Sequence, residues 1–293
     1  MTDFSTSSTI GFIGLGVMGQ SMAGHILAAG HPLHVFTRSK NKADSLIEAG
    51  ATWHDDPASL APHCDVIITI VGFPADVEAV YLGDDGLVAT ARAGAVLIDM
   101  TTSSPALAQR IAEAAAERDI ATLDAPVSGG DVGARNAALS IMVGGPRKTF
   151  EAVKPLLELM GKTIVYQGEA GAGQHTKMSN QIAIAAGMLG VCEALAYAKK
   201  ASLDPETVLS SISGGAAGSW SLSNLGPRML AGNFDPGFFV KHFIKDMGIA
   251  AESAEAIGLD APGLGLALTR YRELAEKGGE GMGTQGLYTL YAD

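Results

Sequence analysis

Residues 9–30 read TIGFIGLGVMGQSMAGHILAAG, and this stretch decides the fold. A short apolar run, Thr9 to Gly14, leads into glycines at positions 14, 16 and 19, and a helix-like run then continues to a stop at Gly30. This is G-x-G-x-x-G between a strand and a helix: the first glycine permits a tight turn, the second lets a pyrophosphate approach the backbone, and the third lets helix pack on strand. The free N–H groups at the helix start favour phosphate. We therefore predict a dinucleotide loop, with a purely structural turn as the alternative; its residues are Gly14, Gly16, Val17, Met18 and Gly19.

The rest of the first half repeats the alternation of strand and helix. Strand-like runs occupy 32–37, 66–71, 95–99, 120–124 and 140–143, and helix-like runs occupy 17–29, 42–49 and 105–118. This order is typical of a parallel, doubly wound sheet. Beyond about Gly168 the strand signals fade, and helical runs follow at 174–201, 205–212, 239–257 and 265–277. We predict an α/β fold in two parts: a Rossmann-type dinucleotide-binding domain, 1–168, and an all-helical substrate and oligomerisation domain, 169–293.

Composition excludes several classes of protein. The chain has 293 residues, of which 47% are hydrophobic and 17% charged, so it can bury a large core. With 31 acidic and 20 basic residues the net charge is −11, which argues against a nucleic-acid partner but not against an anionic substrate.

The two cysteines, Cys64 and Cys192, are too few for a disulfide framework or a zinc site, and no other cluster of metal ligands is evident. Both are expected to be buried thiols, which favours the cytoplasm, and the first residues do not resemble a signal peptide. The apolar run 182–195 is too short and interrupted for a membrane span. Because it is apolar on more than one face, it suggests a homodimer or homotetramer built through the helical half.

The end of the second predicted strand bears on the choice of cofactor. NAD sites usually place an acidic residue there to bind the ribose 2′-hydroxyl. This chain has Thr37, Arg38 and Ser39 instead, and an arginine can bind a 2′-phosphate with two hydrogen bonds. NADP is therefore preferred, NAD remains possible, and a solvated turn is the alternative reading of Arg38.

Two further segments carry candidate chemistry. In GQHTKMSNQ, from Gly173, Lys177 and Asn180 are three residues apart and share a helix face. A buried lysine readily shifts its pKa, which suits a general acid/base, although a solvated first-turn lysine is an equal alternative. In DAPVSGG, from Asp124, the sequence Ser128-Gly129-Gly130 follows a strand and could form a small anion-binding nest or a plain turn.

A last segment, KHFIKDMGIA, places Lys241 and Lys245 four residues apart on a predicted helix. A solvated basic face is the alternative for this pair.

Four blocks in order make the chain similar to the β-hydroxyacid dehydrogenase family, which includes 3-hydroxyisobutyrate dehydrogenases and the tartronate, glyoxylate and succinic semialdehyde reductases. They are GFIGLGVMGQSMA from Gly11, DAPVSGG from Asp124, GQHTKMSNQ from Gly173 and KDMGIA from Lys245. The resemblance covers nearly the whole chain. It departs from the family at Asn180-Gln181, where two asparagines are common, and at 71–74 (VGFP), where Leu-Pro or Val-Pro is common.

The resemblance implies roles position by position. Lys177 matches the catalytic lysine and Asn180 a substrate-orienting amide, while Ser128, Gly129 and Gly130 match the loop that binds the substrate carboxylate. The cofactor positions beyond the glycine loop are Val71 and Gly72, Thr102 near the nicotinamide ribose, and Lys245, with Asp246 completing its motif.

The implied activity is NAD(P)-dependent hydride transfer to or from a small β-hydroxy acid or semialdehyde acid, in a crevice between the two domains, without a metal. The alternatives are an imine reductase-like enzyme, a non-catalytic dinucleotide-binding protein of the same fold, and an oligomerisation or structural protein. The sequence does not choose among 3-hydroxyisobutyrate, 4-hydroxybutyrate, glycerate, glycolate and sulfonate analogues.

Overall fold

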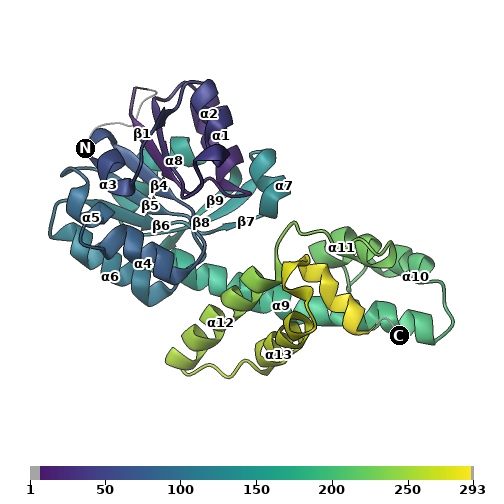
Figure 1. Cartoon of the computed structure of the whole chain (residues 1–293). Helices are drawn as coiled ribbons and strands as arrows, with labels where there is room; N and C mark the ends of the chain where they lie inside the picture. The colour runs from purple at the N-terminus through teal and green to yellow at the C-terminus, as the bar shows by residue number, and fades with distance from the viewer. Residues whose placement is uncertain (1–6, 292–293) are drawn as a thin grey trace. The chain divides into compact units, whose positions relative to one another are not determined.

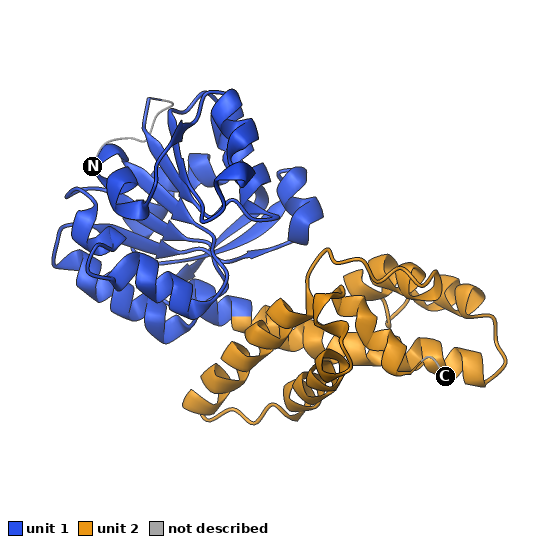
Figure 2. Cartoon of the chain, viewed as in Figure 1, with its two compact units in different colours: residues 1–177 blue, residues 178–293 orange. Residues whose placement is uncertain are grey.

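A computed structural model describes residues 7–291. It divides into two compact units, residues 1–177 and 178–293, which are coloured separately in Figure 2. Each unit has its own hydrophobic core. The two units are therefore described in turn.

The first unit is built on one nine-stranded sheet (Figure 1). The order is β3-β2-β1-β4-β5-β6-β8-β7, and β9 pairs with β8. The strands are β1 Ile10–Ile13, β2 Leu33–Phe36, β3 Thr52–Trp53, β4 Val66–Thr69, β5 Val96–Asp99, β6 Ala121–Asp124, β7 Val127–Ser128, β8 Leu139–Gly144 and β9 Gly161–Gly168.

The strand directions correct one expectation. The strands β1 to β6 are parallel, as predicted. However, β8 runs antiparallel to β6 and β7, so the sheet is mixed at this edge, and β9 is parallel to β8. The reason is that β7 and β8 follow β6 through short connections, whereas parallel neighbours need a long crossover.

Helices cover both faces of the sheet, because alternate strand residues point to opposite sides. The helices are α1 Gly19–Ala28, α2 Asp44–Glu48, α3 Pro57–Leu60, α4 Pro74–Leu82, α5 Leu87–Thr90, α6 Pro105–Ala116, α7 Gly130–Arg135 and α8 Arg147–Leu157. In β4, Val66 and Ile68 join the core beneath α1, α2, α7 and α8, whereas Ile67 joins the core beneath α3, α4, α5 and α6. The sheet is therefore doubly wound, and its strand order reverses between β2-β1 and β1-β4. Such a switch point is where ligands bind in this architecture.

The second unit is helical. Its elements are α9 Ala172–Lys200, whose first residues belong to the first unit, α10 Pro205–Ile212, α11 Trp220–Leu230, α12 Val240–Ala256, α13 Pro262–Glu276 and the 3-10 helix η4 Thr284–Leu290. Among the described residues, α9 alone has the length and apolar composition of a membrane span, and half of its most apolar window is buried within the protein. Its buried side chains contribute to the core of the unit, as those of a central helix do.

Candidate active site

The glycine loop has the packing that its motif requires. Gly14 has a φ of +100°, and a Cβ there would collide with the carbonyl of Ile70. A Cβ on Gly19 would collide with Gly14 itself, so helix α1 lies directly on the loop. A Cβ on Gly16, by contrast, would meet nothing within 4 Å, and no neighbour in the described chain demands a glycine there. A glycine reserved for a ligand that approaches the backbone has this property.

The start of α1 is also left open to an anion. Its N-cap residue, Met18, provides no side-chain cap, and the first turn holds no acidic residue. Side chains cap α6, α10 and α11 at Ser104, Asp204 and Ser219, whereas α7, α8 and α12 lack a side-chain cap as α1 does, so the open start of α1 is informative only together with its glycine loop. Since uncapped N–H groups and the helix dipole attract phosphate, the loop and helix fit the pyrophosphate of a dinucleotide.

The residues after β2 lie at the same edge of the sheet. Thr37 is half-buried, whereas Arg38 and Ser39 are exposed. The guanidinium of Arg38 forms an ion pair with Asp76 of α4, with 3.4 Å between Nη1 and Oδ1. The other oxygen of Asp76 accepts a hydrogen bond from the N–H of Phe73. A cofactor phosphate that contacts Arg38 would therefore meet an arginine already facing a carboxylate.

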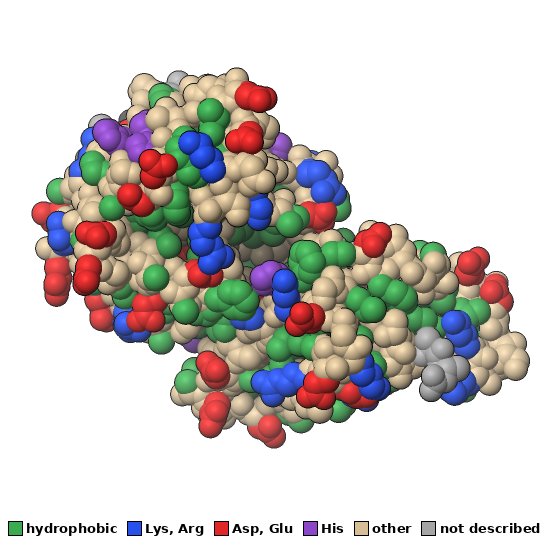
Figure 3. Space-filling model, in the orientation of Figure 1, with side chains coloured by type: hydrophobic (Ala, Val, Ile, Leu, Met, Phe, Trp, Pro, Cys, Tyr) green, Lys and Arg blue, Asp and Glu red, His purple; other side chains and the backbone are tan. Residues whose placement is uncertain are grey.

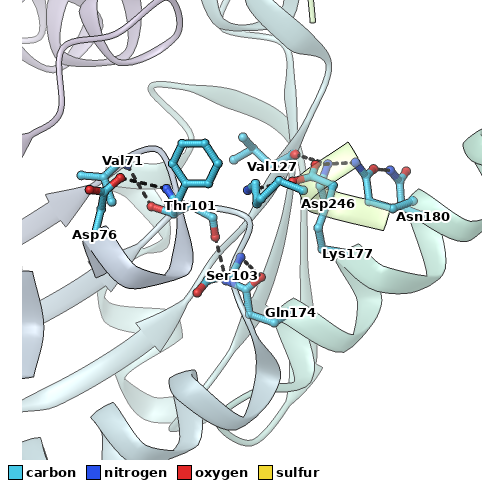
Figure 4. Close-up of polar contacts among 12 residues, drawn as sticks. Val71, Asp76, Thr101, Ser103, Val127, Gln174, Lys177, Asn180 and Asp246 are labelled. Atoms are coloured by element: carbon cyan, nitrogen blue, oxygen red, sulfur yellow. Dashed lines mark hydrogen bonds and ion pairs between the residues drawn. The ribbon is translucent and has the colours of Figure 1, made fainter. Parts of the chain in front are cut away.

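Polar contacts join the ends of β4 and β5 (Figure 4). Val71, which follows β4, donates its N–H to Oγ1 of Thr101, at 2.9 Å. Thr102, half-buried, lies between Thr101 and Ser103. Both of these neighbours bind one side chain of α9: Gln174 donates from Nε2 to the Thr101 carbonyl (2.7 Å) and accepts at Oε1 from the Ser103 N–H (3.0 Å).

The segment DAPVSGG is less of a loop than its sequence suggests. Ser128 ends the short strand β7, pairs with Ser140 of β8 and is half-buried, while Gly130 begins α7. Gly129 and Gly130 both have positive φ, +130° and +61°, which L side chains rarely adopt. The backbone there follows a path that only glycine takes easily.

Lys177 lies beside this segment. It is only 6% exposed, and its Nζ donates to the carbonyl of Val127, at 2.8 Å (Figure 4). The residue that accepts this bond immediately precedes Ser128. The structure therefore brings the lysine and the SGG segment together within the first unit.

Asp124, at the end of β6, holds the start of α9. Its Oδ1 accepts from the N–H of Gly171 and its Oδ2 from the N–H of Gln174, each at 2.8 Å. A Cβ on Gly173 would collide with the Asp124 carbonyl, so the helix backbone lies against the strand end. One carboxylate thus anchors the turn that precedes Lys177.

Two buried carboxyls are neighbours at this sheet edge, because Asp99 and Asp124 are register partners on β5 and β6. Burial raises the pKa of Asp99 to about 6, although hydrogen bonds from Thr101 and Thr69 partly oppose the shift. Burial likewise raises the pKa of Asp124 to about 6, opposed by the N–H groups at the start of α9.

In the helical unit, four side chains form a continuous chain. Asn180 donates from Nδ2 to Oε1 of Gln181 (2.8 Å), Gln181 donates from Nε2 to Oδ2 of Asp246 (2.6 Å), and Oδ1 of Asp246 pairs with Lys245 (2.7 Å). Gln181 and Asp246 are buried. The longer side chain at the position where the family often has asparagine therefore reaches the KDM motif. Lys241, on the same helix, is exposed and lies over the ring of Phe239.

Sequence reasoning missed the residues that organise the site. Gln174, Thr101 and Asp99 are not singled out by their sequence patterns. Gln181 is noted only as a departure from the family's usual pair of asparagines, and Asp124 only as the first residue of the DAPVSGG motif. The available signal was the position of both aspartates at the ends of parallel strands, where functional groups gather. Within residues 7–291, no three His, Cys, Asp or Glu side chains are grouped so as to hold a metal ion.

Two family models cover the chain. Residues 9–168, more than half of it, match the NAD binding domain of 6-phosphogluconate dehydrogenase, and residues 171–291 match the model described as NAD-binding of NADP-dependent 3-hydroxyisobutyrate dehydrogenase.

Curated relatives match over nearly their full length. An uncharacterized oxidoreductase of Bacillus subtilis is 63% identical, with 97% of this chain and 98% of the relative covered. The 2-hydroxy-3-oxopropionate reductase of Escherichia coli is 40% identical, with 92% of each covered.

Solved structures agree with this similarity. The Mycobacterium tuberculosis 3-hydroxyisobutyrate dehydrogenase with L-serine has a TM-score of 0.90 at 29% identity, covering 98% of this chain and 100% of that one. Psf3 in complex with NADP+ and 2-OPP has a TM-score of 0.89 at 28% identity, covering 97% and 100%. A Streptomyces aurantiacus imine reductase, at 22% identity and a TM-score of 0.65, covers 97% and 100% and shares the fold alone. The chain therefore belongs to the NAD(P)-dependent oxidoreductase family of the 3-hydroxyisobutyrate dehydrogenases, the family that its four sequence blocks resemble.

Proposed function

We propose that this oxidoreductase catalyses reversible hydride transfer between NADP(H) and a small β-hydroxy acid or semialdehyde acid. The observation that carries the proposal is the buried Nζ of Lys177, held by the Val127 carbonyl next to Ser128. A buried lysine at a ligand-binding sheet edge is placed to exchange a proton. The names of the curated relatives, which include a hydroxy-oxopropionate reductase, support this substrate class.

Lys177 is the general acid/base in this proposal. It protonates the carbonyl oxygen during reduction and accepts the hydroxyl proton during oxidation, a role worth about 100- to 10,000-fold in rate. Asn180, one helical turn further along α9, orients the same oxygen. Ser128, Gly129 and Gly130 bind the substrate carboxylate through a hydroxyl and backbone N–H groups.

The cofactor residues fit a dinucleotide. Gly14, Gly16, Val17, Met18 and Gly19 bind the pyrophosphate, and Thr37, Arg38 and Ser39 bind the adenosine ribose, with Arg38 selecting a 2′-phosphate. Val71, Gly72, Thr102 and Lys245 complete the set. When bound, the nicotinamide donates or accepts the hydride.

Substitution of Lys177 tests the assignment. Lys177→Met keeps the length of the buried stem but removes the amine, so kcat should fall by about 100-fold or more while the Kd of NADPH changes little. Lys162→Met, on the exposed edge of β9, is the matched control and should leave kcat unchanged. Turnover of Lys177→Met within a few-fold of the parent would refute the proposed role. The measurements are steady-state kinetics and fluorescence titration of NADPH.

The substrate itself is identified by a panel. Short aldehyde acids that correspond to 3-hydroxyisobutyrate, 4-hydroxybutyrate, glycerate, glycolate and their sulfonate analogues are assayed with NADPH and NADH in parallel. We expect one of them to be reduced with the highest kcat/KM. Binding of NADPH with no turnover on any member would favour a non-catalytic dinucleotide-binding protein.

We further propose a cytoplasmic homodimer or homotetramer, with residues 1–168 as the cofactor domain and 169–293 as the substrate and oligomerisation domain. The exposed side of α9 supports self-association, because it carries Ala183, Gly187, Gly190 and Tyr197 at helical spacing. A Cβ on Gly187 or Gly190 would meet nothing within 4 Å, so the described chain does not itself require these glycines. The two cysteines are free and buried, as a reduced compartment allows.

A further inference from the structure

We propose that Gln174 is a positioning residue for the reaction: it fixes the segment around Thr102 to the helix that carries Lys177. This inference rests on the proposed function, because it assigns Thr102 to the cofactor and Lys177 to proton transfer. Gln174 is fully buried, and its carboxamide binds both backbone groups that flank Thr102 (Figure 4).

The hydrogen bonds of Gln174 leave its amide one orientation. Its NH2 group must face the carbonyl of Thr101, which only accepts, and its oxygen must face the N–H of Ser103, which only donates. The side chain therefore pairs with the backbone on either side of Thr102 much as a neighbouring strand would. Because these groups are buried, the loss of the amide would leave a carbonyl and an N–H unpaired, and the segment would have to move to satisfy them.

The same contacts extend to the other proposed cofactor segment. The hydroxyl of Thr101 accepts from the N–H of Val71, so the segment held by Gln174 in turn holds the chain that follows β4. The position of Gln174 thereby determines the positions of Val71 and Thr102 together.

Hydrogen bonds also hold the start of α9, from which the side chain of Gln174 projects. The backbone N–H of Gln174 is bound by the carboxylate of Asp124, and Lys177, three residues later, is bound to Val127. Asp124 and Val127 belong to one short segment that leaves β6. Gln174 therefore connects the segment around Thr102, which is proposed to contact the cofactor, to the first turns of α9, which carry Lys177, within a single compact unit.

Gln174 contacts neither substrate nor reacting atoms in this proposal, so its effect is geometric. A displacement of about 1 Å between reacting groups can cost on the order of 100-fold in rate. We therefore expect kcat, more than the binding of either ligand, to depend on Gln174.

The first test uses Gln174→Met, which keeps the length of the side chain and removes both hydrogen bonds. We expect kcat per NADPH-binding site to fall by about 10- to 100-fold, and the Kd of NADPH to rise by a smaller factor than that by which kcat falls. The isotope effect on kcat with NADPH deuterated at the transferred position should rise, because hydride transfer becomes more rate-limiting. A folded variant with the parent's kcat and isotope effect would overturn the proposal.

The chain provides a matched control for loss of a buried glutamine. Gln285 is 1% exposed, and its Nε2 donates to the carbonyls of Asn233 and Asp235 in the helical unit. Gln285→Met should lower the Tm while kcat per binding site and the isotope effect stay at the parent's values. If both variants lose activity only in proportion to the folded fraction, Gln174 is merely structural and the proposal fails.

Gln174→Glu provides a readout that stability alone does not give. In its protonated form the introduced carboxyl can replace both bonds of the amide, whereas in its ionised form it would face the Thr101 carbonyl without a proton to donate. The kcat of this variant relative to the parent should therefore rise as the pH falls from about 8 to about 6, while the ratio for Gln174→Met stays flat. Asp99 and Asp124 titrate nearby and couple to the introduced carboxyl, so the pH profile belongs to the three carboxyls together. Gln174→Met introduces no carboxyl, and its ratio to the parent therefore serves as the baseline.

A flat ratio for folded Gln174→Glu would overturn the proposal, and this profile decides the question if Gln174→Met does not fold. The Lys177→Met experiment separates the two hypotheses. If Lys177→Met is inactive and Gln174→Met behaves as the parent, only the positioning role fails. If Lys177→Met is active, the proposed function fails.

Discussion

Arg38 is the side chain on which the choice of cofactor depends in the proposed function, and it forms an ion pair with Asp76. The pair is largely exposed on the arginine side, so it contributes little to stability. Its importance is for binding, because a 2′-phosphate would compete with the carboxylate of Asp76 for the guanidinium. Asp76 is therefore expected to weaken the binding of NADPH relative to that of NADH.

Two substitutions test this arrangement. Arg38→Asp should raise the KM for NADPH by about 10-fold or more and shift preference towards NADH, because it removes a charge-assisted contact and adds a like charge. Asp76→Asn should shift the preference the opposite way. Arg118→Asp, an exposed arginine on the same unit, is the control for charge alone. The measurement is kcat/KM for NADPH and for NADH. If the ratio of the two values is unchanged in Arg38→Asp, Arg38 does not select the 2′-phosphate.

Individual site residues differed in how far the sequence could reveal them. Lys177 and Ser128 stand in contiguous motifs, and the resemblance assigned roles to them. Gln174 could not be found in this way, since its partners at 101 and 103 are more than 70 residues away in the chain. Its role depends on where α9 begins relative to the end of β5, which is a tertiary fact. Whether the motif residues act as proposed stays a prediction.

At the scale of elements, β5 and β6 place two carboxyls side by side in the interior. Since the pKa of each is about 6 when folded, against an ordinary value of 3.8, the folded state binds protons more tightly than the unfolded state. Their contribution to stability is therefore fully present below about pH 4 and is lost as the pH rises through 6.

Asp99→Asn tests this sign. The Thr69 hydroxyl and the Thr101 N–H both donate to Oδ1 of Asp99, and asparagine keeps this acceptor, so the substitution removes the buried charge and retains these two hydrogen bonds. The free energy of unfolding of the variant minus that of the parent should increase by about 1 to 3 kcal/mol when the pH is raised from about 5 to about 8. Asp204→Asn is the control, because hydrogen bonds from Thr207 lower the pKa of that carboxyl. Urea unfolding at the two pH values gives the difference, and a difference independent of pH would contradict the shift.

The elements found from sequence were those with strong apolar patterns. β1, β4 and β5 are short runs buried on both faces. α6 and α12 have one apolar side over several turns, and α9 is a long run that is apolar on more than one side. The sequence did not reveal α8, whose exposed side is polar and which contains Pro155, or β9, whose residues are mostly exposed or half-buried. It also left the direction of β8 undetermined, because strand pairing is not encoded in local apolar pattern.

At the scale of the whole molecule, the exposed apolar surface bears on the proposed self-association. Figure 3 shows acidic and basic side chains interspersed on the visible face of the helical unit, with apolar side chains between them. Exposed large apolar residues of this unit include Tyr197 on α9 and Leu266 on α13. A second copy of the chain could cover them, because a twofold interface uses the same surface on both partners.

A charge placed on α9 tests the proposed interface. Gly187→Glu should shift the protein towards monomer in light scattering coupled to gel filtration, because two glutamates would face each other across a twofold contact. Ser210→Glu, which adds the same charge to exposed α10, should leave the mass unchanged. A parent that is monomeric at all accessible concentrations would exclude the interface altogether.

The carboxylate of Asp124 accepts hydrogen bonds from Gly171 and Gln174, which are made 47 and 50 residues later, so its burial depends on residues near the end of the first unit. A nascent chain that has just completed β6 holds a carboxylate whose donors have yet to leave the ribosome. The N–H groups of Gly171 and Gln174 can stabilise that carboxylate only after β7, β8 and β9 have been synthesised and have folded onto the sheet. A recombinant fragment or chimera that ends near residue 168 would leave the buried carboxylate of Asp124 without these hydrogen-bond donors. A fragment that ends after the first turns of α9 would retain them.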